Sequence, residues 1–146
     1  MRTAIGWCPC VTGTTPACYT VGVPYPTAAR RKAVLDRVRR ICLALPETSE
    51  RLSHGAPSFF VREKKCFLMV LDSHHGDGRF AIWCAAPLGN QDFLIGANPD
   101  RFFRPPYVGH RGWLGVDLTA GVDWDELEGG VEDAFATVAP KSLLPD

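Results

Sequence analysis

Two stretches with apolar side chains at helical spacing, each ended by a proline, do most to limit how this chain of 146 residues can fold. The first begins after Thr27, a favourable helix N-cap, and ends at Pro46. Its apolar stripe comprises Val34, Leu35, Val38, Ile41, Cys42 and Leu45. The second begins after Asp123 and ends at Pro140, with a stripe formed by Trp124, Leu127, Val131, Ala134, Phe135 and Val138. These stripes predict two amphipathic helices that each bury one side.

Short runs rich in β-branched and aromatic residues lie between the two helices, and we expect strands near 57–61, 66–71, 79–85 and 112–118. A polar turn of hairpin length, residues 62–65, joins the first two strands. Residues 88–103 have a weak helical pattern, with a short turn of helix expected to start at Asn98. This order predicts an α+β fold: an antiparallel sheet of short strands with an N-terminal and a C-terminal helix packed on it.

The first 27 residues differ from the rest, because they are rich in Thr, Gly, Pro and Cys and follow neither a helical nor a strand period. Their prolines and threonines interrupt the apolar stretch that a secretory signal needs. No apolar run approaches the ~20 residues of a membrane-spanning helix. We therefore expect an irregular extension over 1–27, a single domain over 28–146, no membrane association and a cytoplasmic protein.

Six cysteines raise the question of metal binding or disulfide bonds. The spacing of Cys8, Cys10 and Cys18 matches no zinc pattern built from C-x2-C halves. The other three lie in apolar runs, where cysteine acts as a small hydrophobic residue: Cys42, Cys66 and Cys84. The loop over 72–78 contains His74 and His75 beside two aspartates, but a solvated loop explains them equally well. We predict no metal site and no cofactor.

The formal charge of zero conceals an uneven distribution. Residues 28–120 carry 14 basic and 9 acidic side chains, a net charge of +5, whereas residues 121–146 carry one lysine and seven acids, a net charge of −6. Such a chain can have a local basic surface although its overall balance gives no argument for nucleic-acid binding. The alternative is that two helices simply expose differently charged solvated sides.

Catalytic motifs are not evident. His54 and His110 are candidates for a general base, but no serine or cysteine occurs in a known nucleophile turn. The Gly109–Gly112 segment lacks the lysine and the spacing of a phosphate-binding loop. We therefore expect a protein without enzymatic activity.

Basic and aromatic residues are clustered in two places, and they are the strongest functional signal. Arg62, Lys64 and Lys65 share the predicted hairpin turn, and Arg101, Arg104 and Arg111 accompany four aromatic residues between 102 and 113. Cations next to aromatic rings suit phosphate contact and base stacking. The alternative is that Phe102, Phe103 and Trp113 fill the core while the basic side chains are merely solvated, and for these three rings core packing is favoured.

Several ordered motifs between residues ~28 and 144 resemble the MmcQ/YjbR family, in particular its actinobacterial branch. They are the segments 45–50 (LPETSE), 55–61 (GAPSFFV), 65–67 (KCF), 102–109 (FFRPPYVG), 112–118 (GWLGVDL), 123–127 (DWDEL) and 139–143 (APKSL). The resemblance implies a CyaY-like fold of the double-wing type, whose members are described as DNA-binding candidates. It also implies a link to antibiotic resistance through drug binding for some members. It supplies no catalytic residues, and fold-level analogy alone does not establish function.

Two hypotheses follow. The first is a non-enzymatic domain that binds DNA through phosphate contacts from the basic side chains Arg62, Lys64, Lys65, Arg101, Arg104 and Arg111. Tyr107 and Trp113 would then be available for stacking. The alternative is a protein that binds a small aromatic ligand, a drug or a metabolite, in an aromatic pocket. Its lining would come from Trp83, Trp113 and Tyr107, with His54 and His110 as further candidates.

Overall fold

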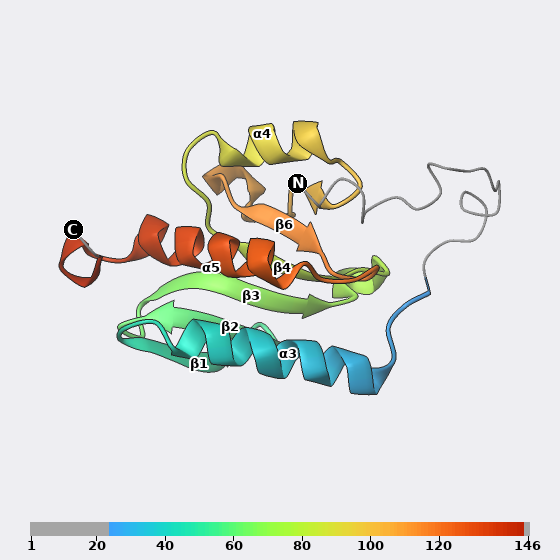
Figure 1. Cartoon of the computed structure of the whole chain (residues 1–146), viewed down its shortest axis with the longest axis horizontal. Coiled ribbons are helices and arrows are strands. Elements are labelled where there is room, and N and C mark those ends of the chain that lie inside the picture. Colours follow the sequence, from blue (N-terminus) through green and yellow to red (C-terminus); the bar gives the residue numbers. More distant parts are fainter. Residues whose placement is uncertain (1–23, 145–146) are drawn as a thin grey trace.

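A six-stranded antiparallel sheet organises residues 24–144, the part of the chain that the structure, a computed structural model, describes. Its strand order is β1-β2-β3-β4-β6-β5. The strands are β1 (Thr48–Ser53), β2 (Ala56–Val61), β3 (Lys65–Asp72), β4 (Phe80–Cys84), β5 (Phe102–Phe103) and β6 (Leu114–Asp117). Helices α3 (Ala28–Leu43) and α5 (Trp124–Val138) lie on one face of the sheet, and α4 (Asn90–Ala97) lies beside the β5 edge (Figure 1). The predicted α+β class is confirmed.

Both long helices begin at the predicted caps. The Thr27 hydroxyl accepts a hydrogen bond from the Arg30 N–H, and the Asp123 carboxylate accepts one from the Glu126 N–H. Their buried residues belong to the two predicted stripes. The two helices are joined by the Arg37 guanidinium, which lies 4.4 Å from the centre of the Trp124 ring. The predicted helices are therefore confirmed, together with the layer they form.

The core lies between this helical layer and the sheet. A β-bulge leaves Phe67 without a cross-strand partner, because Cys66 and Leu68 already pair with the two neighbouring phenylalanines of β2. Phe67 and Leu68 are fully buried. The Phe67 ring meets the Phe135 ring of α5 edge to face, with centroids 5.8 Å apart. The bulge thus inserts an extra aromatic ring into the middle of the core.

The structure adds two strands that the sequence did not indicate. β1 is a polar segment that forms by pairing with β2 across a tight turn at His54 and Gly55, both at positive φ. At Asn98 the structure has a single hydrogen-bonded turn and no separate helix. The Asn98 carbonyl accepts from the Arg101 and Phe102 N–H groups, and the chain then enters β5. Neither β1 nor β5 has a local apolar pattern, so only pairing with a neighbouring strand creates them.

None of the helices in residues 24–144 is both long and apolar enough to cross a membrane.

Candidate functional site

The sheet has a second face, turned away from α3 and α5, which we call the open face. Side chains alternate between the faces, so Phe103, Gly115 and Trp83, which are aligned across three strands, point to the open face. Gly115 is required here, since a Cβ atom would come within 2.4 Å of the Phe103 ring. No α-helix of the described residues covers this face.

Three arginines stack on aromatic rings of the open face, and we call them the stacked arginines. The Arg51 guanidinium lies 3.6 Å from the centre of the Phe60 ring. The Arg79 guanidinium lies 4.0 Å from the Phe103 ring, and that of Arg111 lies 5.6 Å from the Trp113 ring. Because the three arginines come from β1, from the residue before β4 and from the turn before β6, the fold brings together segments that are distant in sequence.

The stacked arginines keep their charge without a carboxylate partner among the described residues. Arg51 donates from Nη1 to the Glu63 carbonyl at 3.0 Å, which ties it to the β2–β3 turn. Burial raises the pKa of the Cys66 thiol. Backbone hydrogen bonds with Leu68 and Phe59 oppose that rise, and so do the nearby Arg111 and Arg51 charges. The positive charges of Arg51 and Arg111 therefore both lie near the partly buried Cys66 side chain.

An aromatic group covers the middle of this face. The His74 ring meets the Trp83 ring at a centroid distance of 4.9 Å and the Tyr107 ring at 5.9 Å, both edge to face. Trp83 is only 3% exposed, whereas Tyr107 is 67% exposed. Tyr107 is therefore the accessible ring of this group, and Trp83 forms part of its support.

The predicted basic turn is present and exposed between β2 and β3. Arg62 and Glu63 both have positive φ, and the Lys64 N–H donates to the Val61 carbonyl, so a tight turn lies within the three-residue loop 62–64 that joins β2 to β3. Arg62 donates from Nε to Glu47 Oε1 at 2.6 Å, and this hydrogen bond lowers the pKa of Glu47. Lys64 and Lys65 are exposed. The turn thus presents two lysines beside an arginine that is already paired.

Arg104 holds the loop that carries Arg111. Its Nη1 donates to Gln91 Oε1 at 2.9 Å, and Gln91 Nε2 donates to the carbonyls of Gly109 and Trp113 at 2.8 and 2.6 Å. Gln91 is buried, so these bonds are shielded from water. Arg104 and Gln91 therefore fix both ends of the short segment on which Arg111 lies.

Arg101, which the sequence analysis placed together with Arg104 and Arg111, lies on the face of the sheet that α3 and α5 cover, which we call the helix side. It is 6% exposed, and its Nη2 is 2.8 Å from Glu126 Oε1 of α5. Desolvation lowers the pKa of Arg101, and the carboxylates around it oppose that effect. The fold does not bring Arg101 to the open face with the stacked arginines.

The remaining predicted residues are exposed turn residues. His54 occupies the β1–β2 turn and His110 the 3₁₀ turn Gly109–Arg111. In the part of the chain that the structure describes, neither histidine takes part in a hydrogen bond or an ion pair. No group of three or more potential metal ligands occurs in residues 24–144. Cys8, Cys10 and Cys18 lie outside the described residues.

Sequence reasoning missed Arg51 and Arg79. Arg51 would have been found if residues 48–53 had been recognised as a strand, since the alternation then places it on the same face as Phe60. Arg79 lies at the start of a strand that was predicted, but its ring partner belongs to β5, which was not. Both omissions arise from the same two unpredicted strands.

A cavity of about 310 Å³ opens on the other face of the sheet, between α4 and α5. Its lining includes apolar side chains of β4 and β6, among them Ile82, Leu114 and Val116. Trp83, Trp113 and Tyr107, the rings of the predicted aromatic pocket, do not line it. The cavity and the stacked arginines therefore occupy opposite sides of one sheet.

Comparison with known proteins gives two positive findings. The family described as YjbR matches residues 43–137 of the chain. Among solved structures, the chain is similar to the crystal structure of Deinococcus radiodurans protein DR2400, family-model domain DUF419. The two share 17% sequence identity over 75% of this chain and 81% of that one, with a TM-score of 0.62. This likeness shows the fold alone. No curated protein matches the chain.

Proposed function

The chain belongs to the YjbR family, and on this basis we propose that it is a non-enzymatic protein that binds DNA through the open face of its sheet. The observation that carries the proposal is the set of stacked arginines, Arg51, Arg79 and Arg111. Each has an aromatic ring beneath it and no carboxylate partner among the described residues.

A guanidinium that lies over a ring still has its N–H groups available at the edge of its plane. Those groups match the geometry of phosphate oxygens, and the ring limits the number of conformations that binding must freeze out. Three such arginines on one face therefore form a partly preorganised set of phosphate contacts. Lys64 and Lys65 extend this set at the β2–β3 turn, to which Arg51 is hydrogen-bonded.

Two further features support the same face. The exposed ring of Tyr107 can stack on a base, a contact that tolerates any sequence. The acidic segment 121–146 includes α5, which lies on the opposite side of the sheet. The negative charge of this segment therefore opposes the approach of a polyanion at α5.

The test is a titration of labelled duplex and single-stranded DNA at two salt concentrations, about 50 and about 200 mM. We expect a dissociation constant of ~10⁻⁴ to 10⁻⁶ M that weakens with salt, with a slope of about −0.9 per phosphate contact on duplex DNA. The triple variant Arg51→Gln/Arg79→Gln/Arg111→Gln should reduce the magnitude of the slope by about 2.7, the value for three contacts.

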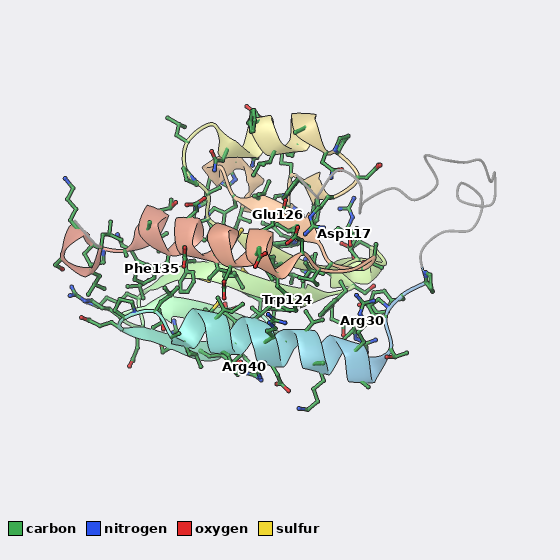
Figure 2. All side chains as sticks on the ribbon, viewed as in Figure 1. Arg30, Arg40, Asp117, Trp124, Glu126 and Phe135 are labelled. Atoms are coloured by element: carbon green, nitrogen blue, oxygen red, sulfur yellow. The ribbon has the colours of Figure 1, made fainter. Side chains whose placement is uncertain are left out.

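The matched control removes the same charge from the helix side: Arg30→Gln/Arg37→Gln/Arg40→Gln, three exposed arginines of α3, of which Figure 2 labels Arg30 and Arg40. Arg37 is itself stacked on a ring, so this control also tests whether stacking alone has an effect. The control should retain most of the salt slope. Equal losses in the two triple variants would contradict the open face as the interface. Binding weaker than ~10⁻⁴ M at low salt, or binding without a salt slope, would contradict DNA binding itself.

A further inference from the structure

The two long helices leave part of their own side of the sheet uncovered. α5 packs mainly on β3, and α4 contacts β5. The cavity of about 310 Å³ lies between α4 and α5 and reaches β4 and β6. Apolar side chains of the sheet and helices account for most of its wall, and they include Ile82, Leu94, Phe102, Leu114, Val116 and Leu127. Its volume lies at the small end of the range of ~300–1,000 Å³ that is typical of small-molecule sites.

A pair of glycines in the middle of α5 borders this cavity. Glycine is the least favourable helix residue after proline, so Gly129 and Gly130 both weaken the helix. Packing does not require them, because a Cβ atom at either position would meet no other atom within 4 Å. Neither has a backbone conformation that favours glycine. Since both residues line the cavity, their clearest effect is to leave space where side chains would stand.

The charged groups around the cavity are mostly acidic. Asp125, Glu126 and Asp133 contribute carboxylates, and Arg101 contributes the one guanidinium of the lining. The ion pair with Glu126, at 2.8 Å, balances the charge of Arg101. Glu126 lies on the side of α5 toward α4 and β6 (Figure 2). A ligand in this cavity therefore meets an apolar wall together with the carboxylate of Asp133.

We propose that this cavity binds a compact apolar amine. The hydrophobic body lies against the sheet between Leu94 and Leu127, and the ammonium group lies near the carboxylate of Asp133. The site is independent of the open face, because the sheet separates the two. Success or failure of DNA binding consequently does not affect it.

Three probes of nearly equal shape test this proposal: 1-naphthylmethylamine, 1-naphthalenemethanol and 1-naphthoic acid, which are a cation, a neutral molecule and an anion near pH 7. Each is titrated into the full chain, and the amide signals of Gly129 and Gly130 are followed by NMR. We expect the amine to bind about tenfold more tightly than the alcohol, the size of effect for one partly screened ion pair, and the acid to bind most weakly. Equal binding of the amine and the acid, or shifts that avoid both glycines, would overturn the proposal.

Variants separate shape from charge. Gly130→Leu fills the cavity and should weaken amine binding more than tenfold. The control is Gly96→Leu in α4, a helical glycine that also has free space around it but does not line the cavity. This control should leave amine binding unchanged. Asp133→Asn should weaken the amine severalfold and leave the alcohol unaffected. This second variant retains the shape of the site, so the proposal remains testable if Gly130→Leu does not fold.

A competing occupant is the chain itself. Nuclear Overhauser contacts from the methyl groups of Leu94 and Leu127 to residues 1–23, together with no response to any probe, would assign the cavity to that segment and overturn the small-molecule site. Contacts from these methyl groups to the naphthyl protons would support it.

Discussion

Two arginines on each face of the sheet lie in opposite environments. On the helix side, Arg39 is hydrogen-bonded to both oxygens of Glu50, and Arg101 is paired with Glu126. On the open face, Arg51 and Arg79 lie on aromatic rings and have no carboxylate partner among the described residues. An arginine enclosed by packing needs a counter-charge, because desolvation penalises an isolated ion. An exposed arginine that lies on a ring can bury its flat apolar surface there and keep its charge toward solvent.

This difference separates residues that hold the fold together from residues that are available to a partner. Substitutions on the helix side should therefore lower the free energy of unfolding, and those on the open face should mainly change binding. The following predictions test that separation.

The largest effect is expected from Phe67→Ala. Phe67 is fully buried and packs edge to face on Phe135, so its truncation should reduce the free energy of unfolding by about 3–5 kcal/mol. Urea denaturation measures the loss. Phe103→Ala is the comparison on the open face, where the ring is only half-buried, and it should cost distinctly less. Similar losses for the two variants would show that both faces contribute equally to stability.

A smaller loss is expected from Glu126→Gln, which removes the charge opposite Arg101. Breaking a fully buried ion pair costs about 3–5 kcal/mol, but the Glu126 side chain is 42% exposed, and we expect about 2 kcal/mol. Thermal or urea unfolding measures it. Glu128→Gln, an exposed glutamate of the same helix, should change stability by no more than about 0.5 kcal/mol. If Glu126→Gln changed the free energy of unfolding as little as Glu128→Gln, the ion pair between Glu126 and Arg101 would not contribute to stability.

On the open face, Gly115→Ala should displace the Phe103 ring and remove the support beneath Arg79. We expect a cost of about 1–2 kcal/mol from overpacking and severalfold weaker DNA binding. The same substitution in a Phe103→Ala background should cost less, because the colliding ring is gone. A cost that is equal in both backgrounds would mean that the close approach of Gly115 and Phe103 does not constrain this face.

The sequence predicted those parts of the fold whose signals are local. Thr27 and Asp123 mark helix starts, and the hairpin over 62–65 is flanked by recognisable strands. β1 and β5 escaped prediction because their pairing partners create them, and Arg51 and Arg79 escaped with them. The grouping of Arg101 with Arg104 and Arg111 assumed that neighbours in sequence share a surface. The chain turns between Arg101 and Arg111, and the two lie on different faces.

The smallest effect concerns Arg62, a phosphate contact predicted from the sequence. It is paired with a carboxylate, that of Glu47, as the arginines Arg39 and Arg101 of the helix side are. Its hydrogen bond lowers the pKa of Glu47, so the pair is complete at neutral pH and is lost only as the pH falls through that lowered pKa. Glu47→Gln should release Arg62 as an additional phosphate contact and strengthen DNA binding about two- to fivefold at low salt. Glu63→Gln removes the same charge from the same turn without releasing Arg62, since Glu63 has no ion-pair partner among the described residues. Titration of duplex DNA with both variants separates the two causes. A gain for Glu47→Gln alone means that carboxylate pairing is what withholds an arginine from this interface, whereas equal gains mean that the net charge of the turn is sufficient.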